Sequence, residues 1–256
     1  MRVLAVGDIV GKTGLQKLKD VLPYIIKEKE IDFVIVNGEN AADGMGLTEK
    51  MYREILALNV DVVTMGNHTW GKKEIFNFIE DKNIVRPANY PSNNPGKGYE
   101  FFECKNKTIA VINLIGRTTM GVLSENPFII AKDIIDEIKE AVDIIIIDFH
   151  AEATAEKIAL GYYLDGEATI IFGTHTHVQT ADEKILEKGT AYISDIGMTG
   201  PKKSVIGMDV DASIKRFVTS LPEKYKVAEG KGMFNSCIFE IDENTNKVTK
   251  IERLNK

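Results

Sequence analysis

Residues 169–177 read TIIFGTHTH, and this stretch decides the fold. The apolar, β-branched run 169–172 predicts a buried strand, and Gly173 with two histidines follows where that strand should end. Residues 144–150, IIIIDFH, repeat the arrangement with one histidine. Because ligands of open α/β sheets gather at the carboxyl ends of strands, these histidines predict a ligand site.

Strand-like and helix-like segments alternate along the chain, which is the pattern of sheets covered by helices. The expected strands are 3–6, 33–36, 60–65, 144–149, 169–172 and 191–194, and the expected helices begin near Leu15 and cover 48–58, 72–82 and 128–141. Hairpins over 99–114 and 233–254 indicate a second or mixed sheet, and 197–201 is expected to be a loop near the site. Without a repeat or linker, residues 1–256 predict a single domain.

The composition limits the function. A net charge of -6 argues against a broad nucleic-acid surface, because such a surface needs clustered Lys and Arg. Cys104 and Cys237 lie outside any CxxC spacing, so we expect neither a disulfide framework nor a zinc finger. The chain starts on a strand-like segment without a leader, and its apolar runs are far shorter than the roughly 20 residues of a membrane span. We therefore expect a cytoplasmic protein without a membrane partner.

Five expected strand ends carry side chains that can bind metal. They are Gly7-Asp8, Gly38-Glu39-Asn40, Gly66-Asn67-His68, Asp148-Phe149-His150 and Gly173-Thr174-His175-Thr176-His177. A single histidine is more often structural than a ligand, but all four histidines of the chain fall in these turns. Mixed nitrogen and oxygen donors suit manganese, iron or zinc better than calcium. Two ions about 3.5 to 4 Å apart would use the whole set, as in known phosphoester hydrolysis.

A phosphate-binding P-loop is the competing interpretation of residues 7–13, GDIVGKT. Only three residues separate its two glycines, whereas a P-loop needs four to wrap a phosphate. Residues 144–148 imitate the apolar strand ending in Asp that holds magnesium in nucleoside triphosphatases. That alternative leaves the histidines unexplained.

The turns at Gly66-Asn67-His68, His150 and 173–177, in that order, resemble the signature of the calcineurin-like metallophosphoesterase superfamily. Two positions depart from it: Val10 stands where a histidine is usual, and residues 37–40 read NGEN instead of an Asp-based turn. Both departures are similar to the bacterial YmdB-like branch of 2',3'-cyclic-nucleotide phosphodiesterases, and this resemblance covers essentially the whole chain.

The resemblance implies an α/β fold, a four-layer αββα sandwich of two mixed sheets with outer helices. It also implies two divalent or mixed-valence transition metals, with iron or manganese ahead of zinc. One metal would be bound by Asp8, Glu39, Asn40 and His177, and the other by Glu39, Asn67, His150 and His175. Glu39 would bridge the two ions. The implied substrate is a small cyclic nucleotide, above all 2',3'-cAMP.

His68 follows the expected ligand Asn67 and should face the same cavity. Our hypothesis is that two cations lower the pKa of a water that attacks phosphorus, while His68 acts as the general acid for the departing ribose oxygen. The alternative is that His68 only orients Asn67.

Several alternatives stay open. Arg117 and Thr118 either contact the substrate or belong to the surface, and Trp70 and Tyr90 either stack on a base or complete the core. A nucleotidase or phosphomonoesterase would use the same chemistry. A regulatory interaction protein would keep the metals only to stabilise its fold. We also expect a homo-oligomer.

Overall fold

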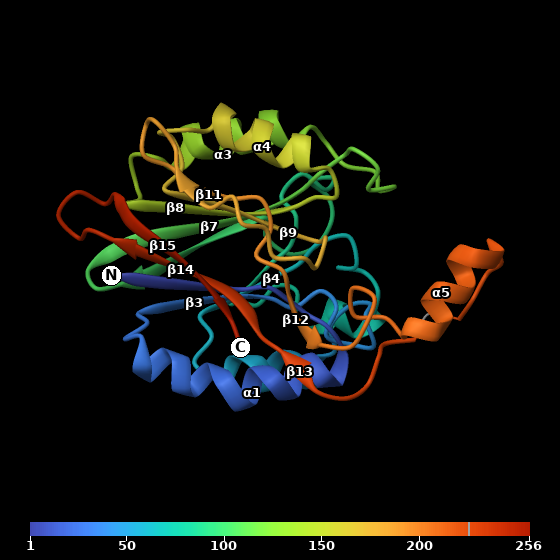
Figure 1. Ribbon diagram of the computed structural model, residues 1–256. Helices are drawn as coiled ribbons and strands as arrows, with labels where there is room; N and C mark the ends of the chain where they lie inside the picture. The colour runs from blue at the N-terminus through green and yellow to red at the C-terminus, as the bar shows by residue number, and fades with distance from the viewer. Residues whose placement is uncertain (225) are drawn as a thin grey trace.

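Two six-stranded sheets form the centre of the computed structural model, which describes residues 1–224 and 226–256 (Figure 1). The first sheet has the order β15-β14-β1-β3-β4-β5. Its members are β1 (Arg2–Val6), β3 (Phe33–Asn37), β4 (Val62–Thr64), β5 (Ile84–Val85), β14 (Asn235–Ile241) and β15 (Val248–Asn255). Strands β1, β3, β4 and β5 are parallel, whereas β14 runs antiparallel to both β1 and β15. The first sheet is therefore mixed.

The second sheet has the order β10-β11-β9-β8-β7-β6. Its members are β6 (Tyr99–Cys104), β7 (Lys107–Ile115), β8 (Ile144–His150), β9 (Ile170–Thr174), β10 (Lys184–Ile185) and β11 (Ala191–Ile193). The four inner strands are parallel, and β6 and β10 are antiparallel edges. Both predicted hairpins are present, and they make the sheets mixed as expected.

Successive side chains of β8 point to opposite faces of the second sheet, so this strand contacts both the first sheet and the outer helices. Ile144 and Ile146 pack in the core between the two sheets, whereas Ile145 and Ile147 pack in the core beneath the outer helices. Those helices are α3 (Pro127–Ile138) and α4 (Thr154–Tyr163); α1 (Gly11–Glu28) and α2 (Glu49–Leu56) cover the opposite face of the first sheet (Figure 1). The predicted four-layer αββα sandwich is confirmed.

Two local expectations were wrong. Instead of a helix over 72–82 there is only the short 3₁₀ turn η1 (Lys73–Asn77), whose preceding residue Lys72 offers no side-chain cap. Instead of a loop over 197–201 there is strand β12 (Met198–Pro201), which pairs with β2 (Asp8–Ile9) and β13 (Gly232–Met233) in a small third sheet. Helices α4 and α5 (Val210–Thr219) were not expected from the sequence.

Within the described ranges, no helix combines the length and apolar character that a membrane crossing requires.

The core between the sheets should be sensitive to cavities. Ile146→Ala removes fully buried methyl groups, so we expect the free energy of unfolding to fall by about 2 to 5 kcal/mol in urea denaturation. Ile129→Ala on α3 is the matched control, because that side chain is 56% exposed. Equal losses for the two variants would contradict this assignment of the core.

Candidate metal centre

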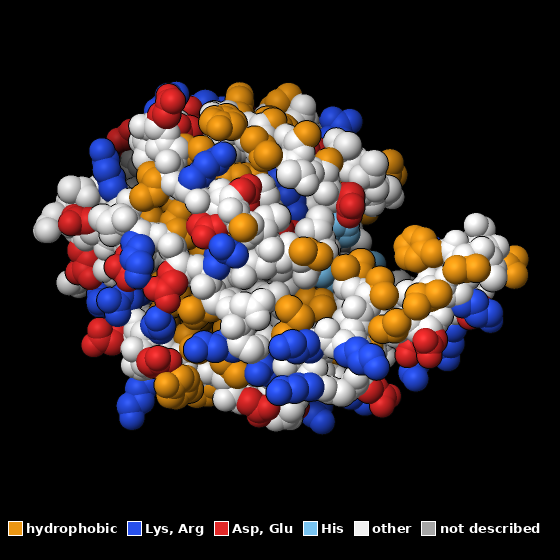
Figure 2. All heavy atoms as spheres, in the orientation of Figure 1, with side chains coloured by type: hydrophobic (Ala, Val, Ile, Leu, Met, Phe, Trp, Pro, Cys, Tyr) orange, Lys and Arg blue, Asp and Glu red, His pale blue; other side chains and the backbone are white. Residues whose placement is uncertain are grey.

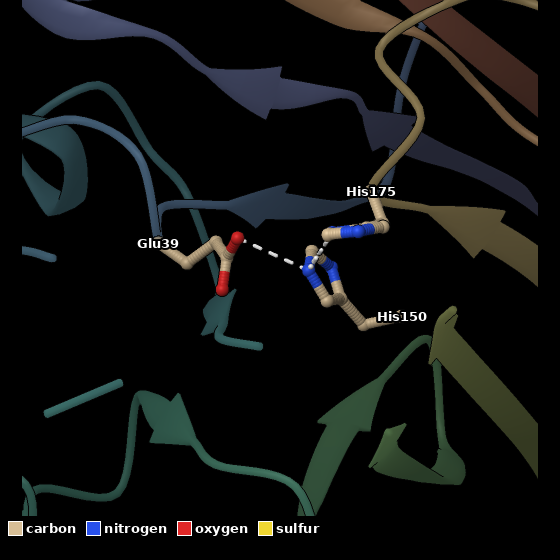
Figure 3. A group of neighbouring side chains, drawn as sticks. All are labelled: Glu39, His150 and His175. Carbon is tan, nitrogen blue, oxygen red and sulfur yellow. Dashed lines mark hydrogen bonds and ion pairs between the residues drawn. The ribbon is translucent and has the colours of Figure 1, made fainter. Parts of the chain in front are cut away.

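The side chains predicted to bind metal lie at the carboxyl ends of parallel strands from both sheets. Asp8 begins β2, Glu39 and Asn40 follow β3, Asn67 and His68 follow β4, His150 ends β8, and His175 and His177 follow β9. In Figure 3, Glu39 from the first sheet faces His150 and His175 from the second. The approach is close enough to require Gly66, where a Cβ would lie 2.4 Å from Glu39 Oε2.

One group of donor atoms surrounds His150 Nε2. Glu39 Oε1 lies 3.0 Å from this nitrogen, Asn67 Oδ1 2.9 Å and His175 Nδ1 3.0 Å. Separations of this size are those of neighbouring ligands around one ion, since metal–ligand distances are about 2.0 to 2.2 Å. Glu39, His150 and His175 thus form a group that can hold a metal ion.

A second group surrounds Asp8. Its Oδ1 lies 3.8 Å from His177 Nε2. His150 Nδ1 is 3.9 Å from the same oxygen, but its hydrogen-bond partner is Thr174. This oxygen is buried and has no hydrogen-bond partner among the described residues. Asn40 Nδ2 lies 3.2 Å from His177 Nε2 and donates to Glu39 Oε1 over 3.0 Å. To bind an ion here, the Asn40 amide must present its oxygen instead, which is the opposite orientation of the same planar group.

Three imidazoles of the centre share one feature: the ring nitrogen that points away from it has its own polar partner. These pairs are His150 Nδ1 with Thr174 Oγ1 (2.9 Å), His175 Nε2 with Glu152 Oε2 (3.2 Å) and His177 Nδ1 with the Ile206 carbonyl (2.8 Å). An outer nitrogen that donates its proton leaves the inner nitrogen with a lone pair. Because lone pairs and carboxylate oxygens converge, the donor set fits a cation.

A buried carboxylate fixes the direction of the first of these pairs. Thr174 Oγ1 donates to Asp148 Oδ1 over 2.7 Å, so it accepts the proton of His150 Nδ1. The other oxygen of Asp148 accepts hydrogen bonds from Thr64 Oγ1 (2.5 Å) and Asn37 Nδ2 (3.1 Å) of the first sheet. Asp148 therefore ties the two sheets together beneath the centre.

Burial and close contact shift the pKa values of three groups in the centre. Burial opposes ionisation of Glu39, but the charge and hydrogen bond of His150 lower the pKa of Glu39 to about 2. Burial also disfavours a charged His150, yet Glu39 and Asp8 raise the pKa of His150 to about 9. For Asp8, burial raises the pKa despite the nearby His177 and His150. A metal that takes the place of the His150 proton would satisfy the same negative charge.

The turn that carries His175 and His177 is strained. The φ angles of these residues are 97° and 64°, in the left-handed region that non-glycine residues rarely adopt. Buried Lys157 Nζ donates to the Thr174 carbonyl and to Asp195 Oδ2, each over 2.7 Å. The same Asp195 oxygen accepts from the backbone N and the Oγ1 of Thr176, at 3.1 and 2.7 Å. This buried ion pair therefore holds the strained turn in place.

The structure bears on the open alternatives. Tyr90 is buried and donates to the Gly66 carbonyl over 3.3 Å, so its ring completes the core. Trp70 is partly buried: it packs on the edge of the core and stacks on the exposed Phe76. The guanidinium of Arg117 has no ion-pair partner among the described residues, while its backbone N donates to Glu156. His68 is close to Asn67, with His68 Nε2 3.3 Å from Asn67 Nδ2.

Sequence reasoning missed the supporting residues Glu152, Lys157 and Asp195. Asp148 could have been found from the sequence, because it lies two residues before His150 and therefore on the same side of the strand. Lys157 and Asp195 are 38 residues apart and carried no local signal.

A four-layer sandwich with such a centre at its strand ends is the fold of a calcineurin-like metallophosphoesterase. The chain matches the family model described as "YmdB-like protein" over residues 4–254, and it belongs to that family. The 2',3'-cyclic-nucleotide 2'-phosphodiesterase of Bacillus subtilis (strain 168) is 52% identical over 255 residues, which are 99% of this chain and 96% of that protein.

Two solved structures share the fold over the whole chain. A hypothetical protein from Thermus thermophilus has a TM-score of 0.94 and 39% identity, and the match covers 100% of this chain and 99% of the other. A novel phosphatase from Mycoplasma pneumoniae has a TM-score of 0.95 and 39% identity, with 100% and 93% covered.

The hydroxyl of Thr174 should matter for metal binding. Thr174→Val removes the acceptor for His150 Nδ1, so we expect Mn²⁺ affinity to fall about 10- to 100-fold in isothermal titration calorimetry. Thr174→Ser retains the hydroxyl and should bind Mn²⁺ nearly as well as the wild type. If the Val variant folds and binds Mn²⁺ within twofold of the wild type, the threonine does not orient the ligand.

Proposed function

We propose that this chain is a metal-dependent phosphodiesterase that opens the cyclic phosphate of 2',3'-cyclic nucleotides such as 2',3'-cAMP. The observation that carries this proposal is the gathering of three imidazoles beside two buried carboxylates, with the other ring nitrogen of each imidazole held by a polar partner. The substrate class is supported by the B. subtilis relative, whose name states this activity.

We assign two transition metals to the centre, iron or manganese ahead of zinc. Asp8, Glu39, Asn40 and His177 would hold one, and Glu39, Asn67, His150 and His175 the other. The buried Oδ1 of Asp8, which no described residue hydrogen-bonds, supports the first set, and the 3 Å spacing around His150 Nε2 supports the second. When bound, such a pair supplies positive charge for the phosphate and lowers the pKa of a water.

His68 is our choice for the residue that protonates the departing ribose oxygen. Its backbone N donates to Glu39 Oε2 over 2.9 Å, so the backbone is tied to the centre while the partly exposed ring remains accessible. In a cyclic phosphate the leaving oxygen stays tethered next to phosphorus. A proton from His68 would therefore prevent the ring from closing again.

A phosphomonoesterase is the second candidate, because the Mycoplasma pneumoniae relative is described as a phosphatase. Both reactions need the same metals, and the two candidates differ in the group attached to phosphorus. We further propose that the protein works in the cytoplasm. Its two cysteines are free thiols, which suits a reducing compartment.

Kinetics on a substrate panel separate the two candidates. The manganese-loaded enzyme should hydrolyse 2',3'-cAMP with a kcat/KM at least about tenfold above that for 2'-AMP or 3'-AMP, a difference of about 1.4 kcal/mol in transition-state binding. Glu39→Gln should lose activity on every substrate. A preference for the monophosphates would replace the phosphodiesterase with the phosphomonoesterase.

The general-acid role of His68 is tested at full metal occupancy. We expect kcat of His68→Ala on 2',3'-cAMP to fall about 10² to 10⁴-fold, because proton transfer to the leaving group is lost. Elemental analysis should find the metal content of this variant unchanged. A rate within a few-fold of the wild type removes the general-acid role, and loss of metal shows that His68 mainly orients Asn67.

A further inference from the structure

Helix α5 stands away from the body of the molecule (Figure 1). None of its residues is buried within the described chain. Figure 2 shows apolar side chains gathered along one side of this projecting helix and charged side chains along the other. Val210, Ile214, Phe217 and Val218 follow helical spacing on the apolar side, and exposed Leu221 comes just after the helix; we call these five residues the α5 stripe.

The α5 stripe is too exposed to water for an apolar helix face that has no partner. Phe217 is 80% exposed and Val218 78%, so two large apolar side chains stand almost wholly in water. A helix of 10 residues is also too short to be stable in water by itself, because most helical stability in proteins comes from packing of the apolar face. Contiguous exposed apolar surface of this kind marks an interaction site.

The charges beside the stripe indicate what covers it. Asp209 and Asp211 lie at the beginning of α5, whereas Lys215 and Arg216 lie toward its end. Asp211 and Lys215 are one turn apart on the same flank of the stripe, and Lys215 also pairs with Glu223 of its own chain. Two copies of α5 packed antiparallel about a twofold axis bring the acidic half of each helix opposite the basic half of the other. The surface is therefore complementary to itself.

We propose that the α5 stripe is the docking surface for a second copy of this chain, with the two α5 helices antiparallel. Ile206, 48% exposed, precedes the helix by four residues, and its carbonyl holds His177 Nδ1 at 2.8 Å. The paired helices would thus steady the segment that orients one ligand of the metal centre.

Sedimentation velocity of the metal-loaded protein tests the stripe. The wild type should sediment as a dimer or a larger even-numbered assembly. The double variant Phe217→Glu/Val218→Glu should form assemblies with half as many chains. Circular dichroism should be unchanged, because neither side chain is buried. Tyr24→Glu, at an exposed aromatic on α1, is the control and should keep the wild-type assembly.

Charge exchange tests the antiparallel arrangement. Asp211→Lys and Lys215→Glu should each weaken self-association at least tenfold, because like charges then face each other in both halves. An equimolar mixture of these two variants should associate again, as a mixed dimer with one chain of each variant. A wild type that is still monomeric at about 100 μM, a Kd equivalent to about -5.5 kcal/mol, contradicts the proposal. So does a mixture that fails to associate, or a monomer that binds vesicles of anionic lipid through Phe217.

Discussion

The structure depends on burying negative charge between two sheets. Glu39 and Asp8 are fully buried; His150 Nε2 lies against Glu39, and His177 Nε2 lies 3.8 Å from Asp8. Uncompensated charges in such surroundings are strongly unfavourable, so the buried carboxylates need positive charge beside them, which a protonated His150 supplies and which, under our proposal, bound metal ions would supply. The close approach of Glu39 and His150 explains the glycine at position 66, because a side chain there would collide with both of them.

Two kinds of contact join the sheets and so keep the buried carboxylates in place. Apolar side chains fill the space between the sheets, and Asp148 links them through Thr64 and Asn37 on one side and Thr174 on the other. The left-handed backbone at His175 is kept in place by the buried pair of Lys157 and Asp195. Rigid strand ends and a supporting set of hydrogen bonds therefore hold these side chains in the positions in which, under our proposal, they would bind metal.

Much of the fold and of the candidate site could be predicted from the sequence, because short stretches of neighbouring residues indicate the strands and the side chains at their ends. β-Branched runs such as 144–147 predict buried strands, and side chains that can bind metal at the ends of these runs indicate the centre. The pair of Lys157 and Asp195 could not be predicted, since 38 residues separate its members and only the fold brings them together. Strand β12 was mistaken for a loop because its pairing with β2 is a long-range contact. Helix α5 has a regular apolar period, but that period could not reveal that its apolar side faces outward.

Anomalous diffraction from crystals grown with Mn²⁺ tests the central claim most directly. Two peaks should appear at the strand ends, one beside Asp8 and His177 and the other beside His150 and His175, with Glu39 in contact with both. If no peak lies among these side chains under any loading condition, or if the only peak lies elsewhere on the molecule, the buried carboxylates do not serve to bind a pair of metal ions.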